Sequence, residues 1–468
     1  MHKTLSAVFL VAVGGVVSAL PCAIAQQPNL ADNRASETPP VQTPATLASA
    51  NIADWIDQQL PGLLQAYQTL HRNPELSWQE TETAALIAGL WREEGFEITT
   101  GIGPDPSAGG GGVVGILRNG QGPTLMLRCD MDGLPVTEQT QLPYASTKTV
   151  SLPGGISTGV MHACGHDIHM TNLVAVARYM ATHRDDWSGT LMVIAQPAEE
   201  KGEGARAMID DGLFTRFAKP DFAVALHVAG DTAAGQVAVL PGYSQANVDS
   251  VDIDVKGRGG HGAAPETTID PIVQAADLVM ALQTIVSREV KPIDPAVITV
   301  GAIAGGTKHN IIGNTCHLQL TVRTYGDEVR AQVLAAIRRK ANAIAQSYGA
   351  PPPELVFSQG TPSLENDAEL AGRLRQVFVG VLGAENVVPN QPSMGGEDFS
   401  RYGREGVPIL MYKLGSVNQS RLDRFEKLGV PPPSLHSSAY YPDVEPTLRT
   451  SVLTMTAAAL DLLSPKPE

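Results

Sequence analysis

The sequence predicts an α/β fold in which helices cover both faces of a mostly parallel sheet, with a small α+β sandwich inserted into it. Three observations predict this fold. Short apolar runs between residues 113 and 226 alternate with helical patterns and carry apolar side chains at consecutive positions, as strands buried on both faces do. At residues 248–255 polar and apolar side chains instead alternate strictly, which is typical of a strand with one wet face. Helix–strand alternation returns after residue 366, and 468 residues are enough for two cores.

The elements of the larger domain follow in order. Apolar residues at helical spacing predict helices at residues 52–70 and 80–95. A helix at 368–382 and a strand at 408–414 continue the alternation near the C-terminus, so this domain is expected to be discontinuous, made of residues 51–246 and 362–468. Runs dense in Val, Leu, Ile and Met predict its other strands, at residues 113–117, 124–129, 190–195 and 222–226.

Residues 247–361 are expected to form the inserted domain. The alternating strand at 248–255 is followed by an amphipathic helix at 271–290. Strands at 297–303 and 317–323 and a helix at 327–345 come next. This β-α-β-β-α order is that of a small, separate α+β sandwich.

The N-terminus has the pattern of an export signal. A short positive start, His2-Lys3, precedes an apolar stretch from Leu5 to Leu20 and the small residues of Ala23-Ile24-Ala25. This pattern predicts a signal peptide at residues 1–25 and an exported protein, periplasmic or secreted; a retained N-terminal anchor is the alternative. Residues 26–50 are rich in Pro, Thr, Ser, Asn and Gln and are expected to be a flexible linker.

The charge and hydropathy of the chain bear on its partners. The formal net charge is −15 and no basic run occurs, which argues against nucleic acid, because phosphate binding needs clustered Lys and Arg. After the signal no stretch is long enough and uncharged enough to cross a membrane. These features favour a globular protein that neither binds nucleic acid nor, once the signal is removed, spans a membrane.

Residues 161–169 carry the strongest local signal, Met-His-Ala-Cys-Gly-His-Asp-Ile-His. Cys164 and His166 present a thiolate and an imidazole two residues apart, and both are natural ligands of zinc and similar metals. Gly165 removes a side chain where the backbone must fold tightly around an ion. Asp167 is placed to orient a ligand through its second ring nitrogen. A buried free cysteine near scattered histidines is the alternative.

Two carboxylates and a histidine follow the ends of two predicted strands. Glu199 and Glu200 come after the strand at 190–195, and His227 closes the strand at 222–226. Open α/β sheets place their sites at the carboxyl ends of strands, and adjacent like charges are tolerated most easily when they share a cation. One carboxylate can bind a metal while the other takes a proton from water. A solvated acidic turn and a core histidine are the alternatives.

Together these residues resemble the M20 family of metallopeptidases, in its aminoacylase-like amidohydrolase branch, which includes hippurate hydrolases and auxin-conjugate hydrolases. The resemblance runs from about His71 to about Glu445, and its motifs arrive in the family's order. They are residues 71–77 (HRNPELS), 128–135 (RCDMDGLP), 161–169, 197–200 (PAEE), 257–265 (GRGGHGAAP), 305–306 with 310, 394–399 (MGGEDF) and 435–436 (LH).

The resemblance implies a site that holds two divalent metal ions, Zn²⁺ or Mn²⁺. Glu199 matches the general base, which deprotonates a metal-bound water and later protonates the leaving amine. Asp132 and Asp167 match carboxylates that support the metal ligands and do not bind the metal ions themselves. The residues that match the metal ligands are Cys164, His166, Glu200, His227 and His436.

The resemblance also implies that the inserted domain is a lid through which two chains form a homodimer. His261 matches a lid histidine that hydrogen-bonds the tetrahedral oxyanion. Asn310 and Arg323 match substrate-binding positions, and a guanidinium at residue 323 would pair with a substrate carboxylate. A solvent-facing position on its alternating strand is the alternative for Arg323.

The implied function is metal-dependent hydrolysis of the amide bond in N-acyl amino acids or small peptides. Two alternatives stay open: an exported dipeptidase or carboxypeptidase, and a non-catalytic module of the same fold that binds metal or peptide. Glu199 argues against the binding module, because such a protein has no use for a base beside its ligands. The acyl group and the leaving amino acid are not fixed by the sequence.

Overall fold

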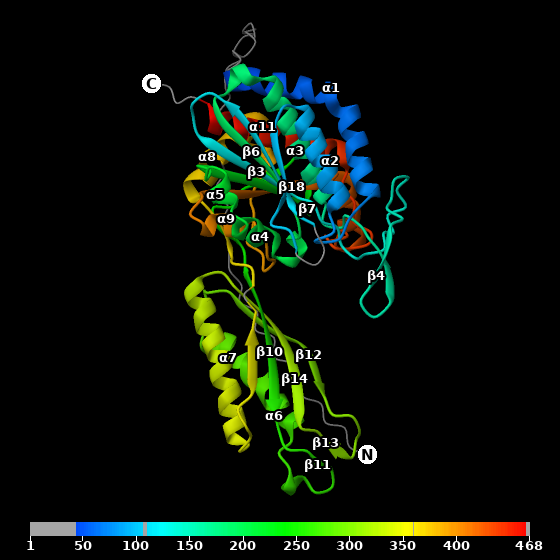
Figure 1. The fold of residues 1–468 in the computed structure, drawn as a ribbon, viewed down its shortest axis with the longest axis vertical. Coiled ribbons are helices and arrows are strands. Elements are labelled where there is room, and N and C mark those ends of the chain that lie inside the picture. Colours follow the sequence, from blue (N-terminus) through cyan, green and yellow to red (C-terminus); the bar gives the residue numbers. More distant parts are fainter. Residues whose placement is uncertain (1–43, 106–109, 359, 465–468) are drawn as a thin grey trace, which may run out of the picture. The chain divides into compact units, whose positions relative to one another are not determined.

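The computed structural model describes residues 44–105, 110–358 and 360–464 (Figure 1). The predicted signal peptide at 1–25 and most of the predicted linker lie outside these residues. Helix α1 (Pro44–Arg72) begins inside the predicted linker, so that prediction is wrong for residues 44–50. Proline suits the first turn of a helix, and the alanines and leucine of residues 45–50 favour helix more than the Thr and Ser among them oppose it. Within the described ranges no helix combines the length and apolarity needed to cross a membrane.

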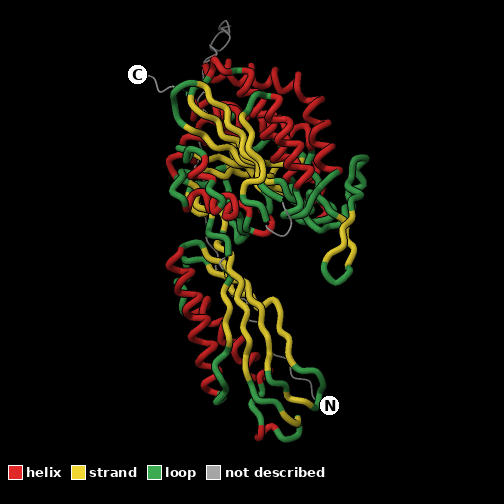
Figure 2. The backbone as a smooth tube through the Cα atoms, viewed as in Figure 1, coloured by secondary structure: helices red, strands yellow, loops and turns green. Residues whose placement is uncertain are grey.

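Eight strands form the main sheet, in the order β1-β2-β6-β3-β7-β18-β8-β17. Figure 2 shows strands in yellow and helices in red. Its centre is parallel, because β3 pairs with β6 and β7, and β18 pairs with β7. Only towards its edges do antiparallel pairs occur, β2 with β6 and with β1, and β8 with β18. The mostly parallel sheet is therefore confirmed. The strands are β1 (Glu97–Ile102), β2 (Gly112–Asn119), β3 (Thr124–Asp130), β6 (Gly189–Gln196), β7 (Phe222–Ala233), β8 (Val237–Ala238), β17 (Val387–Val388) and β18 (Ile409–Val417).

Helices cover both faces of this sheet, as predicted. Alternate residues of a strand point to opposite faces, so Leu125 and Leu127 lie in one core and Met126 lies in the other. The first core is closed by α1, α2 (Thr81–Glu93), α3 (His166–Thr182), α8 (Ala368–Leu382) and α11 (Val444–Leu463). The second is closed by α4 (Gly204–Asp210), α5 (Leu213–Arg216) and α9 (Ser400–Arg404).

The small four-stranded sheet has the order β12-β14-β10-β15 and is antiparallel throughout. Its strands are β10 (Asn247–Lys256), β12 (Ala296–Gly305), β14 (Thr315–Thr324) and β15 (Glu354–Phe357). Buried and less buried residues alternate along β10, and α6 (Pro271–Arg288) and α7 (Asp327–Ser347) pack on its buried face in a core of their own. The predicted β-α-β-β-α order is confirmed, and β15 is an additional strand.

The remaining elements are short. β4 (Thr149–Leu152) and β5 (Ile156–Gly159) form a hairpin, and β9 (Gly242–Gln245) pairs with β16 (Leu364–Asn366). β11 (Gly260–His261) pairs with β13 (Ile311–Ile312), and α10 (Gln419–Leu428) has no buried residue. The cysteines of the described residues, Cys129, Cys164 and Cys316, are free and buried.

Candidate metal centre

A glycine turn presents the thiol and the first imidazole. Cys164 precedes helix α3 and His166 is its first residue, with Gly165 between them in the left-handed region at φ +75°. A Cβ at Gly165 would also lie 2.6 Å from Val228 Cγ2, so both the backbone angle and the space require glycine. The tight turn predicted at this glycine is present, but the crowding that excludes a side chain comes from Val228 of strand β7.

A second turn presents the two glutamates. Strand β6 ends at Gln196, and Ala198 takes φ +51° before the 3₁₀ turn Glu199–Lys201. The carboxylate of Asp132 holds this turn, because it accepts hydrogen bonds from the backbone N–H of Glu199 (3.2 Å) and of Glu200 (3.0 Å). Asp132 thus fixes the direction of both glutamates.

The predicted ligands converge on one place. Cys164 Sγ lies 3.5 Å from His227 Nε2, and His436 Nε2 lies 3.4 Å from Glu200 Oε1. His166 Nε2 lies 4.0 Å from the same Glu200 oxygen. Three overlapping groups have potential ligand atoms within 4.8 Å of one another: Cys164 with His166 and His227, Cys164 with Glu200 and His436, and His166 with Glu199 and Glu200.

The imidazoles are oriented so that one nitrogen of each remains available. His166 Nδ1 donates to the backbone oxygen of Asp132 (2.8 Å), and His227 Nδ1 donates to that of Val228 (2.8 Å). Both Nε2 atoms therefore face the cluster. His166 Nε2 and Glu200 Oε1 are buried without a hydrogen-bond partner among the described residues. Such atoms are costly unless something binds them, and nitrogen, sulfur and oxygen donors at this spacing fit divalent ions.

Burial and charge set the protonation of these groups. Burial, followed by the neighbouring His169, lowers the pKa of His227 to about 4, which leaves the neutral imidazole that binds metals. Burial alone would also lower the pKa of His166, but the carboxylates of Asp130 and Asp132 raise it to about 10. His166 therefore lies where the protein's charges favour a cation, and a metal ion can replace the proton.

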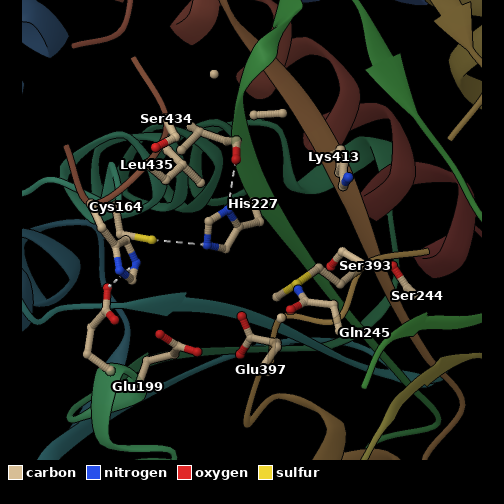
Figure 3. A pocket seen from close by; sticks show the side chains of 18 of the residues that line it. Cys164, Glu199, His227, Ser244, Gln245, Ser393, Glu397, Lys413, Ser434 and Leu435 are labelled. Atoms are coloured by element: carbon tan, nitrogen blue, oxygen red, sulfur yellow. Dashed lines mark hydrogen bonds and ion pairs between the residues drawn. The ribbon is translucent and has the colours of Figure 1, made fainter. Parts of the chain in front are cut away.

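The cluster lines one side of a cavity (Figure 3). His227 lies in the middle of β7, which continues to Ala233, so the prediction that His227 closes this strand is wrong. Cys164 and Glu199 lie around His227. His436 lies in a turn after Pro431–Pro433, which also line the cavity. It has φ +69°, and its backbone N–H donates to Ala163 O (2.9 Å), which holds it against the glycine turn.

Comparison with known proteins decides the family. Residues 126–425 match the model of Peptidase family M20/M25/M40. The chain belongs to this family. It is 36% identical to the N-acetyl-L-cysteine deacetylase of Bacillus subtilis over 348 residues, which are 74% of this chain and 78% of that protein. It is 38% identical to the hippurate hydrolase of Campylobacter jejuni over 334 residues, 70% of this chain and 82% of that protein.

A solved structure agrees with this membership. The crystal structure of a Bacillus subtilis dinuclear metal-binding peptidase from the M20 family matches with a TM-score of 0.70 at 30% identity, covering 86% of this chain and 98% of that one. The present M20 chain is accordingly a metal-dependent hydrolase of amide bonds, with divalent metal ions at its site.

Two predicted M20 lid residues lie away from the cavity. His261 is exposed in the β11–β13 pair, and its Nδ1 accepts a hydrogen bond from Ala263 N (3.0 Å). Asn310 is exposed beside it, where its backbone oxygen accepts from Gly262 N (2.9 Å). Arg323 instead lines the cavity. The structure thus brings Arg323 to the site and leaves the roles of His261 and Asn310 as predictions.

Asp167 does not support a predicted ligand in this structure. Its carboxylate accepts hydrogen bonds from His71 Nδ1 (2.7 Å) and from Ile168 N (2.9 Å). The prediction fails because Asp167 is the second residue of α3, and its side chain turns towards α1. Asp132 supports His166, because its backbone oxygen accepts from His166 Nδ1 (2.8 Å) and its carboxylate lies 3.4 Å from the same nitrogen, which agrees with its predicted place.

A buried charged network that was not predicted from the sequence lies behind the glutamates. Arg128, wholly buried, donates to Asp130 (2.5 Å), Glu397 (3.0 Å) and Asp398 (3.2 Å). Glu397 also lines the cavity, and its carboxylate forms a close group with those of Glu199 and Asp398. The signal was present, because an arginine interrupts the apolar strand at 124–129 and two acids stand together at 397–398.

Proposed function

We propose that this M20 enzyme hydrolyses the amide bond of N-acyl amino acids, with Glu199 as the general base. The observation that supports this most is the state of the Glu199 carboxylate. It is buried, lines the cavity and lies within 4.8 Å of ligand atoms of His166 and Glu200, yet it accepts no hydrogen bond from a described residue. A carboxylate that faces the cavity and has no structural donor is available to take a proton from water there.

The proposed ligands would hold two divalent ions. Thiolate and imidazole donors favour zinc, and carboxylates also accept manganese. Bound there, the ions would polarise the scissile carbonyl and make water acidic near neutral pH. The ligands are Cys164, His166, Glu200, His227 and His436.

The role of Glu199 in the proposed reaction is proton transfer. It takes the proton of the attacking water and returns it to the leaving nitrogen. Burial, followed by the charge of Glu397, raises the pKa of Glu199 well above its usual range. A carboxyl with a raised pKa can hold the proton between the two steps.

The position of Arg323 supports the proposal that one product is an amino acid with a free carboxylate. Its Nε donates to Thr321 Oγ1 (3.1 Å), and it has no ion-pair partner among the described residues. Its remaining N–H groups can therefore bind a carboxylate in the cavity through two parallel hydrogen bonds. The two relatives, by their names, also act on N-acyl amino acids, a deacetylase on N-acetyl-L-cysteine and a hydrolase on hippurate.

The test is hydrolysis of N-acyl amino acids and unblocked dipeptides by the purified chain, before and after chelation and reloading with Zn²⁺ or Mn²⁺. We expect activity on the acyl amino acids that chelation removes and a metal restores. Glu199→Gln should lower kcat by about 10²–10⁴-fold with metal content unchanged. Glu203→Gln, an exposed glutamate on the same loop, is the matched control.

Three results would contradict the proposal. Cleavage of dipeptides alone would favour the dipeptidase or carboxypeptidase. Bound metal with no cleavage of any substrate would favour the binding module. Full activity of a metal-loaded Glu199→Gln variant would remove Glu199 from the role of base.

A further inference from the structure

Strand β18 carries one charged side chain among otherwise buried residues. Every residue of Ile409–Val417 is buried except Lys413, which is partly exposed. The strand lies inside the main sheet, between β7 and β8. A lysine in such a strand must either pair with an acid or reach water. Lys413 lines the same cavity as the metal cluster, so its ammonium is solvated there.

The register of the sheet places Lys413 beside a predicted metal ligand. β18 and β7 pair in parallel, and Lys413 is the partner of His227. Neighbours in a parallel ladder point to the same face, so both side chains leave the sheet on the cavity side. Figure 3 shows Lys413 on the side of the cavity that carries Ser244 and Ser393, opposite to Glu199.

No described carboxylate neutralises Lys413. It takes part in no ion pair, whereas Arg128, the buried cation on the same sheet, has three carboxylate partners. Divalent ions bound at the proposed ligands would add positive charge to the same cavity. The unpaired ammonium is therefore available to an anion that enters the cavity.

We propose that Lys413 forms an anion subsite, so that preferred substrates carry a carboxylate besides the α-carboxylate assigned to Arg323. This inference rests on the proposed function and narrows it to N-acyl amino acids with a second negative charge. The charge can belong to the acyl group or to the side chain of the amino acid. Lys413 is then a specificity residue that pairs with this group and takes no part in proton transfer.

The test compares charged substrates with their neutral amides, using the metal-loaded full chain. One pair, N-acetyl-L-glutamate and N-acetyl-L-glutamine, varies the amino-acid side, and the other, N-succinyl-L-methionine and its succinamoyl counterpart, varies the acyl side. We expect the wild type to prefer the charged member of at least one pair. Lys413→Met should lower kcat/KM for that member by about ten- to hundredfold and for its neutral amide by less than about threefold. Lys413→Arg should retain the preference.

Lys201→Met is the matched control, because Lys201 lines the same cavity but is exposed. It should leave the preference unchanged. An equal loss in both lysine variants would mean general attraction of anions and would overturn the subsite. A wild type that cleaves both members of each pair equally would overturn it too, while leaving the proposed function intact. A wild type that cleaves none of these four, nor any other acyl amino acid, would contradict the proposed function itself.

Discussion

Arg128 shows how a single residue can organise an active site without reaching its cavity. Its guanidinium binds carboxylates from β3 and from the segment after β17, so it joins Asp130 to Glu397 and Asp398. Asp130 in turn accepts from His169 Nδ1 (2.6 Å), and His169 Nε2 accepts from Val228 N (3.0 Å), next to His227. Because none of these charges is exposed, each depends on its partners for compensation.

Arg128→Met should therefore be strongly destabilising, because it leaves three carboxylates buried without their cation. We expect the free energy of unfolding to fall by about 3–5 kcal/mol, measured by urea denaturation of the metal-free chain. Arg118→Met is the control: Arg118 pairs with Glu97 (2.6 Å) but is 66% exposed, and its loss should cost less than about 1 kcal/mol. Similar losses for both variants would contradict the argument.

His71 gives a prediction for pH. Its ring lies between Asp167 (2.7 Å) and Glu138 (3.1 Å). Burial alone lowers its pKa, but these two carboxylates, Asp167 first, raise it to about 9, against about 6.5 in an unfolded chain. A raised pKa in the folded state means that the stabilisation is complete below about pH 6.5 and is lost as the pH rises through about 9.

The wild type should therefore exceed His71→Gln in stability by up to about 3 kcal/mol near pH 6, and the difference should shrink towards pH 9. Urea denaturation of both chains at pH 6, 7.5 and 9 measures this. A difference that stays constant over that range would show that His71 stabilises by packing alone.

At the scale of elements, strand β12 is an open edge. It lies at the end of the four-stranded sheet, and its residues from Gly301 to Gly305 are all exposed, Ile303 by 54%. On the adjacent helix α6, Met280 is 70% exposed. An exposed apolar edge strand beside an apolar helix face is a surface to which another chain can add. This supports the predicted homodimer through the lid.

We expect the chain to be a dimer in size-exclusion chromatography with light scattering, and Ile303→Lys or Met280→Glu to weaken it by at least tenfold in Kd. Ile156→Lys on the β4–β5 hairpin is the matched control, since Ile156 is 63% exposed. A monomeric wild type at micromolar concentration, or equal effects of all three variants, would contradict dimerisation through this edge.

The helices that the sequence predicts well are those with one buried and one exposed face. Helix α8 matches its predicted bounds, and it shows a clear apolar face. Helices α3 and α11 were not predicted, although α11 is the C-terminal helix of the first core. Most of their residues are buried on all sides, so small and apolar residues occur without a period. Periodicity disappears where a helix is covered by a sheet and by other helices at once.

For the whole molecule, the fold class and the first part of the ligand cluster could be predicted from local patterns, whereas His436 was included only because of the resemblance to the M20 family. Cys164 with His166, and Glu199 with Glu200, stand close together in the chain at strand and helix ends. The partners of Arg128 could not be predicted, because Glu397 is far from Arg128 in sequence and reaches it only in the folded protein. Packing between distant segments likewise sets the orientation of the Asp167 side chain and the position of His261 outside the cavity.

The pairing of β7 with β18 also has a consequence for how the chain is made. The whole four-stranded sheet and α8 lie between these strands in sequence. During synthesis one edge of β7 therefore emerges long before its neighbour exists, and closing so long a loop is slow. The inserted four-stranded sheet can form in this interval, because all of its strands have already been synthesised. The nascent chain is then most prone to aggregate through the bare edge of β7, and a chaperone that covers strand edges would be needed in that window and not after β18 arrives.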